Sequence, residues 1–169
     1  MQEEFGSEDE ATALVHRGAR FLQAHGVQAF LDEVNKRDQG HLIDRDLYLG
    51  VYSMAQICKA HGINPRLVDE DVTDFQDLDG RRFVIDIVAI ARRDGAGHFT
   101  YRWEHPLTCQ PMTKSTHFER HGDLVLSWRA FLNVPARPRA WWPGGAGRRE
   151  RAYAAHPALM SRRMLPISS

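Results

Sequence analysis

Apolar residues at helical spacing predict a helix over residues 8–25. They recur every three or four positions: Ala11, Leu14, Val15, Gly18, Phe21 and Leu22. Ser7 and Glu10 have the spacing of a capping box, in which each side chain accepts a hydrogen bond from the backbone of the other residue. Gly26 ends the pattern. The same periodicity over residues 27–34 predicts a second, shorter helix.

Alternating side chains predict strands in the middle of the chain, after a polar loop at 39–46. Along residues 47–52 two sets alternate: Tyr48, Gly50 and Tyr52 on one face, Leu47, Leu49 and Val51 on the other. Both sets carry apolar bulk, so both faces of this strand are expected to be covered. Residues 57–60 suggest a partner strand, followed by a turn at 62–65. Further strands are predicted at 98–103, 113–119 and 124–132.

One window fits two kinds of secondary structure. Apolar residues from Phe83 onward match a helix at one spacing and a strand at another, and the window reaches about 12 residues, which favours the helix. Asp79 and Gly80 indicate a turn before it, and Gly95 with Gly97 a turn after it. This order of helices and strands indicates an α+β fold with an antiparallel sheet.

Length and charge limit the classes of function. The chain has 169 residues, enough for one domain with a hydrophobic core. The formal net charge is zero, so there is no electrostatic reason to expect nucleic acid or a membrane surface as a partner. The sequence contains no run of about 18 apolar residues, so no membrane span is predicted. Residues 1–10 lack the apolar core of a signal peptide, which indicates a cytosolic chain or one whose export segment was removed.

Composition divides the chain into a domain and a tail. The periodic patterns lie within residues 8–133, whereas proline, glycine and arginine dominate residues 134–169. We expect the tail to be disordered, because little in it repeats at the spacing of a packed element. A basic interaction tail is the alternative, and Trp141 and Trp142 favour some docking onto the domain.

The two cysteines carry little information. Cys58 and Cys109 are far apart and form no Cys-x-x-Cys pair. Two buried or idle thiols are expected, and one disulfide in an oxidising compartment is the alternative.

Motifs for metal binding and catalysis do not emerge. His117 and His121 are four residues apart, but they lie on a predicted strand and no third ligand stands at motif spacing. The Asp-x-Asp-Gly motif at 77–80 lacks a calcium loop's opening acid, because Phe75 occupies that position, so a plain turn is expected. No Gly-x-Ser-x-Gly motif or phosphate-binding glycine loop is present. We therefore predict no metal, no cofactor and no catalytic residue.

Arg102 is more informative because it lies between Tyr101 and Trp103 in a predicted strand. A guanidinium can hold a carboxylate through two hydrogen bonds, and aromatic rings can wall the apolar remainder of a ligand. An exposed arginine is the alternative. Strand alternation leaves two sets open for a pocket wall: Arg102 with His98 and Thr100, or Tyr101 with Trp103 and Phe99.

Two further residues have a binding and a structural interpretation. Lys114 is either a ligand contact or an exposed strand residue, for the reasons that apply to Arg102. His61 could donate a hydrogen bond to a ligand, or hold the turn that follows it. We favour the turn.

Four linked motifs carry a resemblance to a known family. They are Asp-Arg-Asp-Leu-Tyr at 44–48, Ala-His-Gly-Ile-Asn-Pro at 60–65, Asp-Leu-Asp-Gly at 77–80 and Tyr-Arg-Trp-Glu-His-Pro at 101–106, and Lys-Ser-Thr at 114–116 follows them. In this order the chain resembles the single Cache domain, a small-molecule sensing module of bacterial chemoreceptors and sensor kinases. The resemblance runs from about residue 8 to residue 132 and is greatest to free-standing exported members.

This resemblance implies a PAS-like antiparallel sheet with a long N-terminal helix packed on one face. It implies a pocket on the other face for a small organic molecule, often a short carboxylate, and a role in signal perception, mostly in the periplasm. A homodimer or a partner receptor would fit the family. The alternatives are a domain that only mediates protein contacts, or an enzyme on a PAS-like scaffold.

The resemblance also gives candidate residues. The ligand-binding candidates are Tyr48, Tyr101, Arg102, Trp103 and Lys114 at family motif positions, together with His61 and His117. Three places depart from the family pattern. His98 stands where the family usually has Trp, His117 where it usually has Tyr, and Ser-Trp-Arg-Ala-Phe at 127–131 where it favours Gly-x-Gly-x-Tyr.

Overall fold

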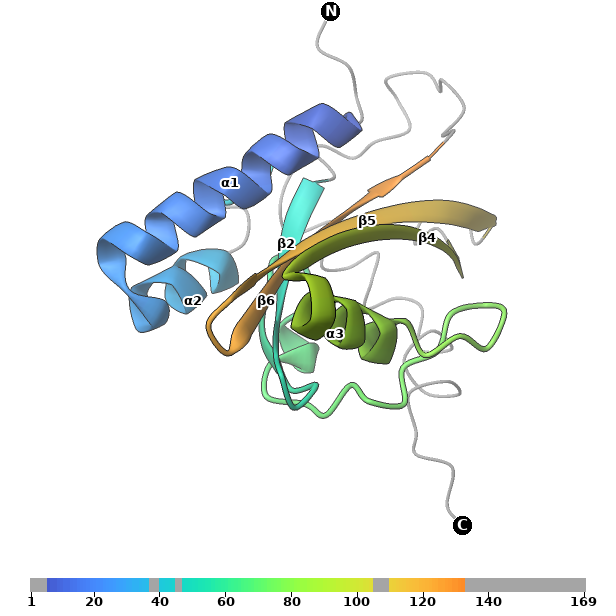
Figure 1. Cartoon of the computed structure of the whole chain (residues 1–169). Coiled ribbons are helices and arrows are strands. Elements are labelled where there is room, and N and C mark those ends of the chain that lie inside the picture. Colours follow the sequence, from blue (N-terminus) through green and yellow to red (C-terminus); the bar gives the residue numbers. More distant parts are fainter. Residues whose placement is uncertain (1–5, 37–39, 45–46, 105–109, 133–169) are drawn as a thin grey trace, which may run out of the picture.

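The computed structural model describes residues 6–36, 40–44, 47–104 and 110–132. An antiparallel sheet separates two helical layers, as Figure 1 shows. Helices α1 (Glu8–His25) and α2 (Val27–Asn35) cover one face, and α3 (Phe83–Asp94) covers the other. The predicted α+β class and the long helix packed along the sheet are confirmed.

Six strands form the antiparallel sheet. They are β1 (Ile43–Asp44), β2 (Leu47–Ser53), β3 (Cys58–His61), β4 (Ala96–Glu104), β5 (Pro111–His121) and β6 (Leu124–Phe131). Their order in the sheet is β1-β2-β6-β5-β4, and β3 pairs with β2. The predicted polar loop at 39–46 contains the short strand β1, because its two residues pair with the beginning of β2.

The first turn of α1 is fixed by the predicted capping box. The Glu10 backbone N–H donates to Ser7 Oγ at 3.2 Å, and the Ser7 backbone N–H donates to Glu10 Oε2 at 2.7 Å. These two bonds satisfy donors that no helical carbonyl can reach. At the other end Gly26 has φ 82°, a conformation that glycine adopts without steric cost.

Each face of the sheet has its own apolar core. On the α1 and α2 side, Leu14 and Phe30 pack against Leu49, Leu126 and Trp128 of the strands. On the α3 side, one cluster joins helix and sheet residues: Val84, Ile87, Val88, Tyr52, Phe118 and Val125. Strand β2 is buried on both faces, as its sequence predicted.

The window over 83–91 is helical, as its length predicted, and α3 ends at Gly95 with φ 80°. The predicted turn at Gly97 is wrong, because β4 already includes this residue. A Cβ at Gly97 would lie 2.6 Å from Phe118 Cζ and 2.7 Å from Ile90 Cγ2. Glycine is therefore needed here because helix and strand approach each other closely.

The loop before α3 folds back along the open edge of β4. Asp77 Oδ1 accepts the backbone N–H of Arg81 at 2.8 Å, which closes a plain turn as predicted. The Leu78 N–H donates to the Arg102 carbonyl at 3.1 Å, and the Arg81 guanidinium donates to the Thr100 carbonyl at 3.4 Å. The turn is thus tied to β4 through backbone groups of the strand.

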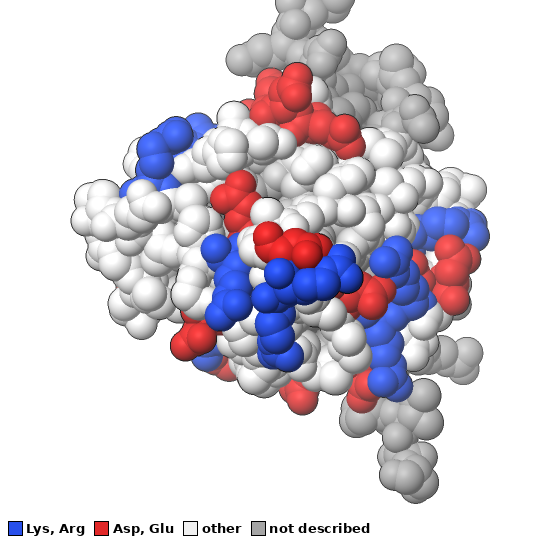
Figure 2. Space-filling view, viewed as in Figure 1, with Lys and Arg blue, Asp and Glu red and all other residues white. Residues whose placement is uncertain are grey.

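Charged side chains over α3 and the preceding loop occur as pairs of opposite sign. Figure 2 shows Lys and Arg interspersed with Asp and Glu on this side of the molecule. Among these pairs, Arg81 Nε lies 2.5 Å from Asp86 Oδ2, and Arg82 Nη2 lies 3.3 Å from Asp74 Oδ1. Exposed pairs of this kind contribute little to stability.

The predictions for the tail and for the two cysteines have different outcomes. The predicted tail, 134–169, and Cys109 lie outside the described residues. Cys58 is a buried free thiol, and burial raises its pKa to about 12. No helix in the described part of the chain is long and apolar enough to cross a membrane.

Candidate ligand-binding site

Strand register brings five polar side chains together on the α3 side of the sheet. Tyr48 of β2 lies opposite Arg129 of β6, and Arg129 lies opposite Thr116 of β5. Two residues further along β5, Lys114 lies opposite Tyr101 of β4. Residues directly opposite each other point to the same face of a sheet, so these side chains share one surface.

Two cations on this surface are almost fully buried. Lys114 is 2% exposed and Arg129 is 6% exposed. The Lys114 Nζ donates to the Tyr48 hydroxyl at 3.3 Å and lies 5.9 Å from the centroid of the Trp103 ring. The Arg129 guanidinium donates to the Tyr52 hydroxyl. Phenols and aromatic faces therefore surround both charges.

Arg129 has less compensation for its charge than a buried cation usually receives. Its Nε is buried and has no hydrogen-bond partner. Within the described residues, no carboxylate lies within 4.0 Å of the Arg129 guanidinium. A buried charge is costly unless it is paired and hydrogen-bonded. An anion that reached this guanidinium would therefore gain a strong, charge-assisted interaction.

The tyrosines around the cations differ in their acidity. Burial raises the pKa of Tyr52 to about 12 and also raises the pKa of Tyr101, so both remain neutral. Burial acts in the same direction on Tyr48, but the charges of Lys114 and Arg129 outweigh it and lower the Tyr48 pKa. The Tyr48 oxygen is therefore the point on which both cations act.

His61 lies beside this cluster and holds a turn. Its Nδ1 accepts the backbone N–H of Asn64 at 3.0 Å and that of Ile63 at 3.4 Å. Burial, and then the charges of Arg129 and Lys114, lower the His61 pKa well below its usual value. The imidazole is therefore neutral, with its proton on Nε2. The predicted role in the turn matches these bonds.

Two of the predicted residues lie elsewhere. Arg102 alternates with Tyr101 and Trp103, so it points to the opposite face of β4. Its side chain is 52% exposed, and its Nη1 lies 3.0 Å from Asp79 Oδ1. His117 lies on the α1 side, where its ring stacks on Trp128 at 4.6 Å between centroids.

The two sets that alternation left open for a pocket wall lie on opposite faces of β4, and Tyr101 and Trp103 are on the α3 side. Tyr101 stacks on Phe83 of α3 at 4.7 Å between ring centroids, and Trp103 meets the same ring edge-on at 5.6 Å. The predicted residues that gather on the α3 side are Tyr48, His61, Tyr101, Trp103 and Lys114.

Sequence reasoning missed Arg129 and Tyr52 as members of this cluster. The signal was present in β6, where Arg129 is the one ionisable residue in an otherwise apolar or small-residue run. In a strand whose neighbours on both sides are apolar, an arginine must be buried with partners or lie at an end. Alternation from Val125 through Ser127 would have placed Arg129 on the α3 side.

Comparison with known sequences decides the family. The profile described as single Cache domain 2 matches residues 12–121. The chain belongs to the single Cache domain family. A curated relative of this Cache domain is the methyl-accepting chemotaxis protein McpP of Pseudomonas putida, 32% identical over 76 residues. The match covers 45% of this chain and only 14% of the length of McpP.

Solved Cache structures share the fold. A methyl-accepting chemotaxis protein from Vibrio parahaemolyticus superposes with a TM-score of 0.59 at 20% identity, covering 75% of this chain and 88% of the other. A Cache chemosensory domain, solved to explain carboxylic acid recognition, gives a TM-score of 0.56 at 20% identity, with 74% and 88% covered. The periplasmic sensor domain of a chemotaxis protein gives 0.55 at 18% identity, with 74% and 90% covered.

Proposed function

We propose that this Cache domain senses a small organic anion, and that a carboxylate is the group it recognises. Lys114 and Arg129 supply the positive charges, and Tyr48 and Tyr52 supply hydroxyl groups beside them. Tyr101 and Trp103 form the aromatic wall on the β4 side. The site lies between the sheet and the layer that contains α3.

The observation that carries this proposal is the buried guanidinium of Arg129. Its Nε has no partner, and no carboxylate of the described residues neutralises it. A protein that only needed a packed core would gain stability from an apolar side chain at this place. An arginine here is useful when an anion binds, because a carboxylate can accept two parallel hydrogen bonds from the guanidinium.

The comparisons support this proposal. One structural neighbour is a Cache domain solved for carboxylic acid recognition, and the curated relative is a chemotaxis receptor. Another neighbour is a periplasmic sensor domain, so we also propose that this domain acts outside the cytoplasmic membrane. A partner receptor and a homodimer remain predictions of the family resemblance.

The arrangement of Ser115 argues against a hydrolase as the alternative. His98 Nε2 lies 2.9 Å from Ser115 Oγ, a contact that a serine nucleophile would need. In a catalytic triad the carboxylate accepts from the far nitrogen of the imidazole. Here Glu8 Oε1 instead accepts from the serine hydroxyl at 2.7 Å, and Ser115 is fully buried.

Matched pairs of ligands test the proposal. We expect short monocarboxylates such as propionate and lactate to raise the melting temperature and to give saturable heats in calorimetry. The corresponding amides have nearly the same shape but no charge, and we expect them to have no effect. Equal stabilisation by acid and amide would contradict the assignment of the buried cations. Absence of binding by any small anion, across a broad panel, would favour a domain that only mediates protein contacts.

Two arginine variants locate the site. Arg129→Met should weaken carboxylate binding by about tenfold or more, because hydrogen bonds to charged groups contribute about 1.5–3 kcal/mol each. Arg102→Met is the matched control, since Arg102 is exposed and paired with Asp79. We expect Arg102→Met to change the affinity less than about twofold, because an exposed ion pair contributes little energy. The opposite order of effects would place the anchor at Arg102.

A further inference from the structure

We propose that Glu8, His98 and His117 form a binding site for a divalent transition-metal ion of the zinc class. One ligand atom from each residue lies within 4.8 Å of the other two. This site is on the α1 side of the sheet, opposite the buried cations. The sequence predicted no metal, and nothing in the proposed sensing of an anion requires one.

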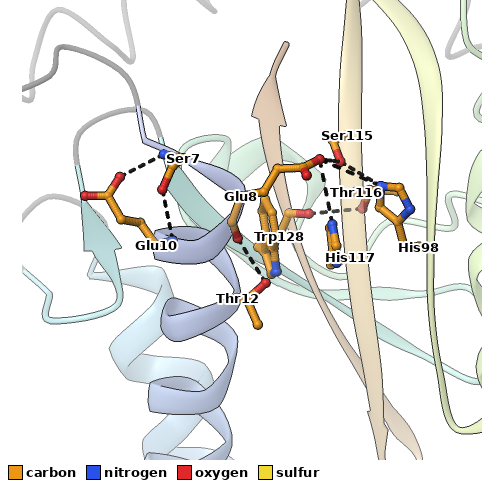
Figure 3. A network of polar contacts seen from close by, with 9 residues as sticks. All are labelled: Ser7, Glu8, Glu10, Thr12, His98, Ser115, Thr116, His117 and Trp128. Atoms are coloured by element: carbon orange, nitrogen blue, oxygen red, sulfur yellow. Dashed lines mark hydrogen bonds and ion pairs between the residues drawn. The ribbon is translucent and has the colours of Figure 1, made fainter.

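Three separate elements bring the ligands together, as Figure 3 shows. His98 of β4 and His117 of β5 are directly opposite in the register, and their ring centroids are 4.1 Å apart. Glu8 reaches them from the first turn of α1. The capping box of Ser7 and Glu10 orders this turn, so Glu8 is held on a rigid element.

The distances fit a small cation that has not drawn its ligands inward. Glu8 Oε1 lies 3.9 Å from His98 Nε2 and 3.9 Å from His117 Nε2. Around a tetrahedral zinc ion, ligand atoms at about 2.05 Å from the metal lie about 3.4 Å from one another. Shortening each of these two contacts by about half an ångström would give tetrahedral spacing between Glu8 and the histidines, and all three ligand atoms already lie within 4.8 Å of one another.

His117 is in the right state to act as a ligand. Its Nε2 is buried and has no hydrogen-bond partner, although it faces Glu8. Stacking on Trp128, with an angle of 7° between the rings, fixes its orientation.

The set of ligands defines the class of ion. Two imidazoles and one carboxylate suit zinc, nickel, copper or cobalt, whereas magnesium and calcium prefer oxygen ligands alone. Ser115 Oγ donates to Glu8 Oε1 at 2.7 Å and would orient the carboxylate, as partners of metal ligands commonly do. The side chains of Glu8 and His98 are 49% and 44% exposed, so an ion can reach the site from solvent.

The site would connect the beginning of α1 to β4 and β5. The proposed site is separate from the buried cations, because it lies on the other face of the sheet. A fourth coordination position is left for water or for a group from another molecule.

Calorimetry and thermal denaturation of the untagged full chain test the proposal with zinc chloride. At pH 7.5 we expect one ion per chain and a rise in melting temperature of at least about 3 °C at saturating zinc. Nickel should also bind, and magnesium should not. Binding should weaken strongly at pH 5.5, because protonated imidazoles cannot coordinate a metal.

Variants assign the ligands. Glu8→Gln, His98→Asn and His117→Asn should each reduce zinc affinity by at least about tenfold, since loss of a mere outer-shell partner already costs that much. Glu8→Gln changes an exposed side chain and keeps the helix, so this variant still tests the site if a histidine variant fails to fold. The control is His16→Gln with His121→Gln, which removes the two imidazoles beside Glu119.

The outcomes separate cleanly. Loss of affinity in the three ligand variants, with the control within about twofold of the original, supports the site. If the control variant lost zinc affinity and Glu8→Gln retained it, the metal would be bound beside Glu119, and the proposal would be overturned. Absence of stoichiometric binding by the original chain would overturn it as well.

Discussion

Acidification should destabilise this domain, because the unfolded chain protonates His61 more readily than the folded chain does. The imidazole is buried, next to Lys114 and Arg129, and its pKa in the folded chain is lowered well below the usual value. The unfolded chain binds a proton at about pH 6.5, whereas the folded chain does not. The stabilising effect of the neutral imidazole is therefore fully present above pH 6.5 and is lost as the pH falls below it.

The magnitude follows from the proton that only the unfolded chain binds. At pH 5.5 the unfolded imidazole is about ten times more often protonated than neutral, which favours unfolding by about 1.4 kcal/mol. At pH 7.5 the same contribution is below about 0.1 kcal/mol. This difference is a measurable fraction of the typical free energy of unfolding, which is about 5–15 kcal/mol.

Urea denaturation at pH 7.5, 6.5 and 5.5 measures this effect. The control is His61→Asn, because an Asn oxygen can accept the backbone N–H groups of Ile63 and Asn64 without titrating. Carboxylates contribute equally to both proteins. We expect the original chain to lose about 1.4 kcal/mol more than the variant between pH 7.5 and 5.5. Parallel pH profiles of the two proteins would refute the reasoning.

Two further predictions concern packing and the tail. Gly97→Ala should destabilise the domain by about 1–3 kcal/mol in urea denaturation, because the new methyl group would lie 2.6 Å from Phe118. Phe118→Leu in the same chain should remove part of that cost, because the contact with Ile90 remains, and simple additivity of the two changes would contradict the clash with Phe118. Deleting residues 135–169 should leave the melting temperature nearly unchanged, since the sequence there lacks periodic apolar groups. A large drop after this deletion would show that Trp141 or Trp142 packs on the domain.

Features that depend on neighbours in the sequence were predictable. Ser7 and Glu10 are three residues apart and cap the same helix turn, so their spacing suffices. The two faces of β2 follow from alternation alone. The length of the window over 83–91 was enough to decide for α3. Each of these depends on contacts within a few residues.

Features that depend on distant contacts were missed or left open. Gly97 was predicted as a turn residue, because the sequence does not show that Phe118 of the next strand packs against it. Arg129 meets Tyr52 across 77 positions of the sequence, and only the strand register brings them together. Glu8 of α1 and His98 of β4 are also far apart in the sequence and meet only in the fold. No local pattern encodes such meetings.

The turn closed by Asp77 has a consequence for how separate molecules behave toward one another. An open sheet edge offers unpaired backbone groups that can template pairing with a strand of another chain, which leads to aggregation. Along β4, the carbonyls of Arg102 and Thr100 already accept hydrogen bonds from Leu78 and Arg81. The turn thus occupies part of the edge that another copy would use. At these two positions, pairing between the β4 edges of two copies is therefore disfavoured.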